Sequence, residues 1–264
     1  MQVIRKLCNV VIFTVAFLGL SLPSYANQLD DIVQRGTLRV AVPQDFPPFG
    51  SVGTDMQPHG YDIDMAAYLA KQLHVKLKLV PVTSANRIPY LTTDKVDLVI
   101  SSLGKNAKRA KVIDFSRPYA PFFLGVFGLK SIDVHQPADL AGKTVGVTRG
   151  AIEDMQLSKI APQNATIKRF EDNNTTLSAY LSGQVDMIAT GNLVIAAIAH
   201  RNSDRIPSTK FTLKNSPCYI GLRQNEPELK AKIDQLIQVA LGNGTLTKMS
   251  QKWLKAPLPA NFGA

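Results

Sequence analysis

The chain has 264 residues, of which 45% are hydrophobic and 19% charged, and its formal net charge is +10. This length suffices for one large domain or two small ones. Lysine and arginine residues form no run interleaved with aromatic residues, which argues against nucleic acid as a partner. No segment after the first 26 residues is long and apolar enough to cross a membrane.

The first 26 residues have the pattern of a secretory signal peptide. Two positive residues, Arg5 and Lys6, precede an almost entirely apolar run at residues 7–22, and small residues surround a cleavage position after Ala26. A membrane anchor is the alternative, but this run is shorter than the roughly 20 residues that span a bilayer. We therefore expect cleavage after Ala26 and export of the mature chain.

The cysteine and histidine residues indicate neither a disulfide framework nor a metal site. Cleavage leaves Cys218 as the only cysteine, and a single thiol cannot form an internal disulfide. Because Cys218 stands beside Tyr219 and Ile220, we interpret it as a small buried residue. The histidines at positions 59, 74, 135 and 200 lack the spacing of metal ligands, so we expect no metal and no cofactor.

Short β-branched runs alternate with helical patterns in the first half of the mature chain. Strands are expected at residues 37–42, 75–82 and 96–101. Between the first two strands, Asp62 is expected to cap an amphipathic helix. A short helix through Ile88 and Leu91 is expected before the third strand.

The same order restarts near residue 122. Strands are expected at residues 122–129, 144–147, 166–170, 185–189, 211–213 and 218–222. Helices are expected at residues 153–160, 175–181, 193–200 and 245–254, together with a long helix that Pro227 opens and Gly242 stops.

This alternation of strands and helices predicts an α/β architecture with mainly parallel strands. Two halves of similar order are joined by the proline-containing segments 117–123 and 206–217, which predicts two lobes with two crossovers and a ligand cleft between them. We expect lobe one to comprise residues 27–120 and a return segment at 216–264, and lobe two to comprise residues 121–215.

Seven motifs occur in a fixed order along residues 37–254. They are Pro47-Pro48-Phe49; Gly60-Tyr61-Asp62-Ile63-Asp64; Asp97; Lys108-Arg109 with Val112-Ile113-Asp114-Phe115-Ser116-Arg117-Pro118-Tyr119; Asp139-Leu140-Ala141-Gly142-Lys143-Thr144; Gly183-Gln184-Val185-Asp186; and the segment 244–253. Together they resemble the bacterial extracellular solute-binding proteins of family 3, the polar amino-acid-binding components of ABC importers. The resemblance implies a periplasmic, monomeric protein with a type II periplasmic-binding-protein-like clamshell fold.

Arg109 is the first candidate for ligand binding. Asn106 can cap a helix there, which places Arg109 in the first helical turn, where a cation is unfavourable unless an anion is nearby. Pairing with a surface acid is the alternative. In the resembled family this arginine binds the α-carboxylate of the ligand, and Ser102 and the loop at Gly104 would add contacts.

The resemblance also implies walls and backbone donors for the cleft. Aromatic residues at the positions of Phe46 and Tyr61 form apolar walls in the family, although both could belong to the core of lobe one. The loop before the first helix of lobe two presents backbone donors to the carboxylate. In this chain that loop continues through Ala151, Ile152 and Glu153.

One position departs from the family pattern. Gly191 stands where the family has an acid that binds the α-ammonium of the ligand. Three explanations stay open: Asn192 or Thr190 accepts from the amine, Glu153 supplies the charge from across the cleft, or the ligand lacks an α-ammonium. If the usual geometry is intact, Gly191→Asp should strengthen amino-acid binding.

The resemblance implies a protein that binds an amino acid or a related small carboxylate and delivers it to an ABC permease in the inner membrane, without catalysis. Two other functions remain open. A relative of this family is cyclohexadienyl dehydratase, and Glu153 is the one attractive acid for such a reaction. The chain could also present its ligand to a membrane-bound sensor.

Overall fold

The computed structural model describes residues 27–199 and 204–263. The predicted signal peptide and His200 lie outside the described residues. Within the described ranges, no helix combines the length and hydropathy needed to span a membrane.

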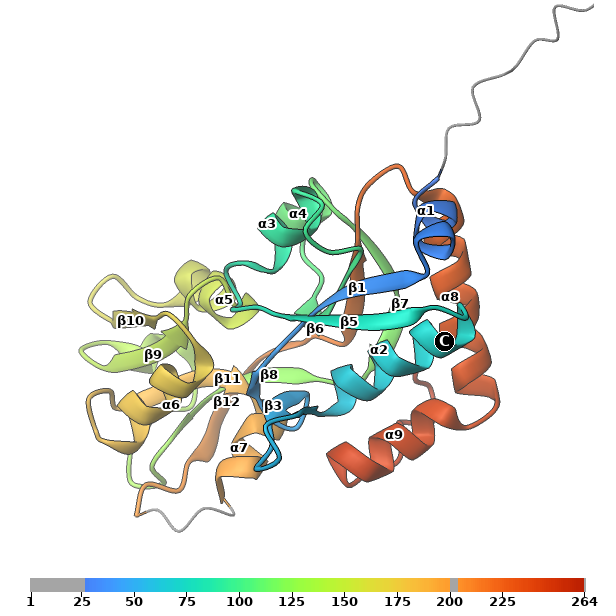
Figure 1. Ribbon diagram of the computed structural model, residues 1–264. Helices are drawn as coiled ribbons and strands as arrows, with labels where there is room; N and C mark the ends of the chain where they lie inside the picture. The colour runs from blue at the N-terminus through green and yellow to red at the C-terminus, as the bar shows by residue number, and fades with distance from the viewer. Residues whose placement is uncertain (1–26, 200–203, 264) are drawn as a thin grey trace, which may run out of the picture.

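The first of two five-stranded sheets has the strand order β5-β1-β6-β13-β7 (Figure 1). Its strands are β1 (Thr37–Val42), β5 (Lys76–Pro81), β6 (Leu98–Gly104), β7 (Asp114–Ala120) and β13 (Cys218–Leu222). Strand β1 runs parallel to β5 and β6, whereas β13 is antiparallel to both of its neighbours. The helices of this lobe are α1 (Gln28–Arg35), α2 (Tyr61–Gln72), α3 (Arg87–Thr92), α4 (Ala107–Ala110), α8 (Pro227–Gly242) and α9 (Thr245–Leu254).

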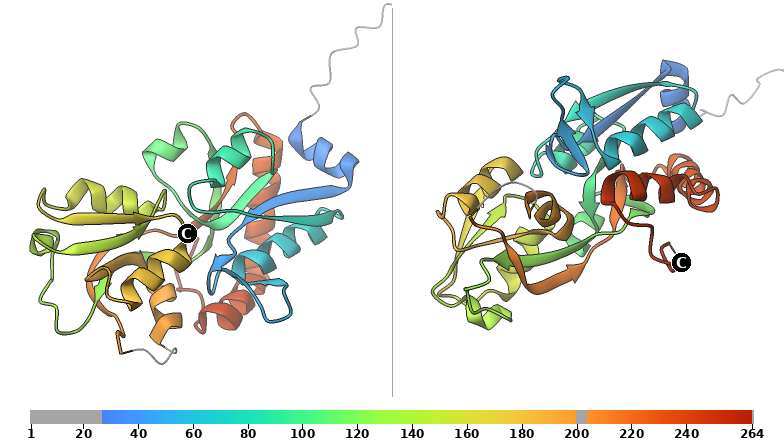
Figure 2. Two further views of the ribbon diagram at one scale, coloured as in Figure 1. Left: turned by 60° about the vertical axis from the view of Figure 1, so that its left-hand side comes forward. Right: turned by 90° about the horizontal axis from the view of Figure 1, so that it is seen from below.

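The second sheet has the order β10-β9-β11-β8-β12. Its strands are β8 (Phe123–Gly128), β9 (Thr144–Thr148), β10 (Thr166–Phe170), β11 (Met187–Gly191) and β12 (Ser208–Asn215), and its helices are α5 (Ile152–Ile160), α6 (Asn173–Leu181) and α7 (Asn192–Ala199). Strand β9 is parallel to β10 and β11, whereas β8 is antiparallel to β11 and β12. Figure 2 shows the two sheets as separate groups with their own helices. The two-lobed α/β fold is confirmed.

Alternation along the strands explains how the helices of lobe one cover both faces of its sheet. Leu38 and Val40 of β1 pack in one buried cluster with Leu69 of α2, whereas Ala41 packs in another with Leu91 of α3. Side chains of neighbouring strand residues point to opposite faces, so β1 is buried on both sides.

Short elements connect these layers. A small sheet of β2 (Asp45–Phe46), β3 (Gly50–Val52) and β4 (Pro58–His59) stands between β1 and α2, and a 3-10 helix, η1 (Pro137–Leu140), precedes β9.

The chain passes twice between the sheets. It leaves the first sheet after Ala120 and returns between Asn215 and Cys218. The predicted connecting segments, 117–123 and 206–217, were too long. Residues 117–120 belong to β7, and residues 208–215 form β12. The predicted lobe boundaries fall in the two connections, and the lobes as separate units stay a prediction.

The predicted role of Asp62 as a helix cap was wrong. Helix α2 begins at Tyr61, and Gly60 is its N-terminal cap residue, which makes no side-chain hydrogen bond. Asp62 is instead fully buried, and its carboxylate accepts hydrogen bonds from the backbone of Ser102 and the hydroxyl of Tyr119.

Candidate functional site

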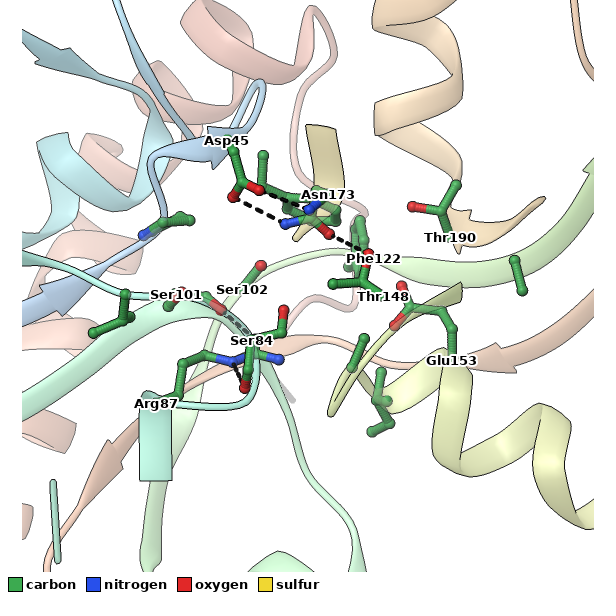
Figure 3. Close-up of a pocket in the computed structure, with 16 residues that line it drawn as sticks. Asp45, Ser84, Arg87, Ser101, Ser102, Phe122, Thr148, Glu153, Asn173 and Thr190 are labelled. Carbon is green, nitrogen blue, oxygen red and sulfur yellow. Dashed lines mark hydrogen bonds between the residues drawn. The ribbon is translucent and has the colours of Figure 1, made fainter. Parts of the chain in front are cut away.

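A narrow cavity lies between the two lobes (Figure 3). In this conformation it leaves about 20 Å³ for the centres of water-sized molecules. That is room for roughly one or two water molecules, so a larger solute enters only when the lobes separate. Lobe one contributes Pro43, Asp45, Phe46, Val82, Ser84, Arg87, Ser101 and Ser102, and the rest of the lining is Phe122, Thr148, Ala151, Ile152, Glu153, Asn173, Ala189 and Thr190.

Arg87 is the buried cation of this cavity. It is the first residue of α3 and is 5% exposed. Its Nε donates to the carbonyl of Ser84 at 3.1 Å and its Nη1 to the carbonyl of Ser101 at 2.7 Å. Among the described residues, Nη2 of Arg87 has no hydrogen-bond acceptor, and no carboxylate forms an ion pair with this side chain. Burial lowers the pKa of Arg87, although the charges of Glu153 and Asp62 oppose this shift. A guanidinium remains charged even so.

Glu153 is the buried anion on the other side. It lies in the first turn of α5, is 5% exposed, and its carboxylate makes no side-chain hydrogen bond within the described part of the chain. Burial raises the pKa of Glu153, which its own backbone N–H, Arg87 and Arg109 partly counter. Figure 3 shows Arg87 and Glu153 on opposite sides of the cavity. A buried carboxylate and a buried guanidinium, each incompletely paired, therefore line the same space.

A polar network closes one wall of the cavity. The Asp45 carboxylate accepts from the backbone N–H of Asn173 at 2.7 Å and from its side-chain amide at 3.0 Å. Thr148 in turn donates its hydroxyl to the side-chain oxygen of Asn173 at 2.9 Å. Asn173 is the first residue of α6, where an anion is favourable. Asp45 of lobe one therefore holds the N-terminus of a lobe-two helix.

Two phenylalanines form the apolar wall. The rings of Phe46 and Phe122 meet edge to face with centroids 6.0 Å apart, and each side chain is almost fully buried. Phe122 also occupies the space beside Gly191. A Cβ atom at Gly191 would lie 1.8 Å from Cζ of Phe122. The expected benefit of Gly191→Asp stays a prediction that this geometry does not support, because the phenyl ring already fills the position of the missing side chain.

Arg109 lies outside the cavity. Its backbone N–H donates to the side chain of Asn106, so the predicted helix cap is confirmed. Its guanidinium, however, donates to the carbonyl of Gly104 at 2.6 Å and to that of Gly150 at 2.9 Å. Burial, then the charge of Arg87, lowers the pKa of Arg109 to about 9, which Glu153 opposes.

Ile152 fills the corner beside Gly104. A Cβ atom on Gly104 would lie 2.7 Å from Cδ1 of Ile152. The hydroxyl oxygen of Ser216 would be equally near, at 2.6 Å, so this space is already occupied by Ile152 and Ser216. Arg109 donates to two carbonyls, one in each lobe. One of them belongs to Gly104, beside which Ile152 lies. The predicted contact of Arg109 with a ligand carboxylate stays a prediction that this geometry does not support.

The structure brings only part of the predicted set to the cavity. Phe46, Ser102, Ala151, Ile152 and Glu153 line it. The others do not: Tyr61 is buried with its hydroxyl on the carbonyl of Tyr119, Asn192 accepts from the backbone of Phe123, and Gly104, Arg109 and Gly191 lie as described above.

Sequence reasoning missed Arg87, Asp45, Phe122 and Asn173. A signal for Arg87 was available, because it also stands in the first turn of a helix that follows a strand, the argument applied to Arg109. Asp45 and Asn173 are 128 residues apart, and no local pattern joins them.

Comparison with known proteins agrees with the fold. Residues 38–256 match the family described as bacterial extracellular solute-binding proteins, family 3. The L-cystine-binding protein TcyJ of Escherichia coli (strain K12) is 27% identical over 242 residues, which cover 90% of this chain and 91% of TcyJ. Cyclohexadienyl dehydratase of Pseudomonas aeruginosa is 26% identical over 251 residues, which cover 92% of this chain and 92% of that protein.

A solved structure shows the same similarity. The cysteine-binding protein from Campylobacter jejuni superposes with a TM-score of 0.81 at 29% sequence identity, over 89% of this chain and 96% of that protein.

Proposed function

Because the chain belongs to family 3 of the bacterial extracellular solute-binding proteins, we propose that it captures a small zwitterion of the amino-acid class between its lobes. Arg87 binds the carboxylate and Glu153 binds the ammonium group. One observation carries this proposal: two buried, opposite charges from different lobes line one cavity, and both have unused hydrogen-bonding capacity.

The physical argument rests on desolvation. A buried charge that lacks a complete set of partners is unfavourable, and a ligand of complementary charge removes this penalty. The free Nη2 of Arg87 can donate to a carboxylate, and the Ser102 and Thr190 hydroxyls lie in the same lining. A zwitterion that bridges Arg87 and Glu153 binds the closed form better than the open form. It therefore shifts the population towards closure.

The relatives support the same class of ligand. TcyJ is named for L-cystine and the Campylobacter jejuni protein for cysteine, both of which carry an α-carboxylate and an α-ammonium. Among the explanations left open for Gly191, this favours Glu153 as the counter-charge from across the cleft.

The biological role that we propose is uptake. The mature protein acts as a monomer in the periplasm, with lobe one at residues 27–120 and 216–264 and lobe two at 121–215. The closed lobes present the ligand to an ABC permease in the inner membrane. The family membership supports this role, and the protein itself performs no chemistry in it.

Calorimetry of residues 27–264 with the twenty L-amino acids and L-cystine tests the proposal. Each amino acid that binds is compared with its decarboxylated and deaminated analogues, which for L-cysteine are cysteamine and 3-mercaptopropionate. We expect both losses to weaken binding at least 10-fold, because each leaves one buried charge unpaired. Arg87→Met should remove the preference for the carboxylate and Glu153→Gln the preference for the ammonium.

Either of two results contradicts the proposal. One is binding that Arg87→Met leaves unchanged. The other is a ligand without a carboxylate that binds as well as its parent amino acid. Lys95→Met, a cation beside the ring of Tyr90 and away from the cavity, serves as the matched control.

A lyase activity is the second candidate. One relative is a cyclohexadienyl dehydratase, and Glu153 is a buried acid whose pKa is raised, as a general acid requires. Incubation with prephenate or arogenate, followed by chromatography, decides between the candidates. We expect no aromatic product, and product formation that Glu153→Gln abolishes would establish the enzyme.

A further inference from the structure

Asp62 is a buried carboxylate that the proposed ligand contacts leave unused. It lies in the first turn of α2, is 0% exposed and does not line the cavity. Its Oδ2 accepts from the backbone N–H of Ser102 at 2.7 Å, and its Oδ1 accepts from the hydroxyl of Tyr119 at 2.5 Å. Through Asp62, helix α2 is hydrogen-bonded to β6, which carries Ser102, and to β7, which leads to the other lobe.

The bonded partner Ser102 has an unusual backbone. Its φ of 41° lies in the left-handed region, which is unfavourable for residues other than glycine. Ser102 lines the cavity, and the carbonyl of its neighbour Ser101 accepts from Nη1 of Arg87. A hydrogen bond to a carboxylate is stronger than one between neutral groups, and this bond holds Ser102 in its conformation.

The other partner, Tyr119, connects the same carboxylate to the crossover. It precedes Ala120, the last residue of β7, after which the chain enters lobe two. The hydroxyl of Tyr61 donates to the carbonyl of Tyr119 at 2.8 Å, so two residues of α2 hold this point of the chain. The Asp62 carboxylate therefore connects the crossover, through Tyr119, with the cavity lining, through Ser102.

We propose that Asp62 is a positioning residue, which holds the Ser102 backbone and through Ser101 aims Arg87 at the ligand. This inference rests on the proposed function, because it assigns the residue that orients the carboxylate-binding arginine.

The ionisation of Asp62 gives the proposal a pH dependence. Burial raises the pKa of Asp62 to about 7, although Tyr119, the Ser102 backbone and Arg87 lower it. The groups that face it are Tyr61 from its own helix, Tyr119 from β7, Cys218 from β13 and Arg87 from α3. Burial raises the pKa values of both tyrosines and of Cys218, so these three groups stay neutral around pH 7. Asp62 is then the group of this set that titrates there.

Protonation affects affinity and stability in opposite directions. Protonation of Oδ1 reverses the bond with Tyr119, whose hydroxyl then accepts from the carboxyl. The bond from the Ser102 N–H remains, but it is weaker because its acceptor has lost the negative charge. Affinity therefore falls as the pH drops through about 7. The pKa of Asp62 is higher in the folded chain than the ordinary value of 3.8 for an aspartate, so its contribution to stability rises as the pH falls from about 7 towards 4. A purely structural role would not separate the two quantities.

Nuclear magnetic resonance of the ligand-free protein tests the positioning directly. We expect the Ser102 amide and the Arg87 Nε–H resonances to titrate together near pH 7. Asp62→Asn should abolish both titrations, whereas the control Asp64→Asn, on the same helix turn and bonded to Lys252 and Trp253, should leave them unchanged. If the Arg87 Nε–H resonance titrates in Asp62→Asn as it does in the unchanged protein, the proposal is overturned. This outcome does not depend on knowing the ligand.

A double-variant cycle with L-cystine provides the functional readout. Glycine adopts the backbone of Ser102 without strain, so Ser102→Gly should reduce the effect of Asp62→Asn. We expect Asp62→Asn to weaken binding about 10-fold at pH 8, without lowering the free energy of unfolding, and less than 3-fold in the Ser102→Gly background. Equal losses in both backgrounds would contradict the inference. If Arg87→Met has no effect on binding, the proposed function fails instead.

Discussion

At the scale of single residues, two apolar side chains fill space beside predicted site residues. Ile152 closes the corner next to Arg109, and the Phe122 ring occupies the place of a side chain at Gly191. Arg87 and Glu153 supply opposite charges a short way along the same cleft.

Gly191 gives a prediction at this scale. Even the methyl group of Gly191→Ala would overlap the ring of Phe122, which must then move into the cavity. We expect at least a 10-fold loss of L-cystine affinity by calorimetry, since a shifted ring takes space from the ligand.

The control for this prediction is the same change beside a smaller neighbour. In a Phe122→Ala background the added methyl group has room, so Gly191→Ala should change affinity less than 3-fold relative to Phe122→Ala alone. A full loss in both backgrounds would show that the Gly191 backbone, and not the ring, is responsible.

The site residues show why sequence reasoning found only part of the cavity lining. Phe46, Ser102 and Glu153 stand at strand ends or helix starts, and that local position can be read from a pattern. Asp45 and Asn173 are 128 residues apart and become partners only when the two lobes meet. The choice between Arg87 and Arg109 depends on which guanidinium the folded chain places in the cavity lining, and a local pattern does not determine that.

At the scale of elements, hydrophobic alternation was sufficient for most strands and helices. Strand β1 has the predicted bounds, and α9 matches its predicted segment. The prediction failed at Asp62. Aspartate is typical of helix caps, but this one lies inside the first turn of α2 and does not cap the helix. Its actual partners, Ser102 and Tyr119, are 40 and 57 residues away, so a local rule could not identify them.

At the scale of the whole molecule, polar contacts join the two lobes. Asp45 accepts from Asn173, and Arg109 donates to the carbonyl of Gly150. Neither contact needs a ligand. They stabilise the closed arrangement in advance, and a ligand that prefers this arrangement gains affinity from them.

Arg109→Met tests this view of closure. A hydrogen bond from a charged group contributes about 1.5–3 kcal/mol, so its loss should shift the ligand-free protein towards the open form. We expect a larger radius of gyration by small-angle X-ray scattering without ligand, and an affinity loss of about 10-fold that is similar for every amino acid that binds. If Arg109 binds the ligand carboxylate instead, L-cysteine should lose far more affinity than cysteamine while the radius of gyration stays unchanged. Lys108→Met, the adjacent residue of α4, controls for the loss of positive charge and should change neither quantity.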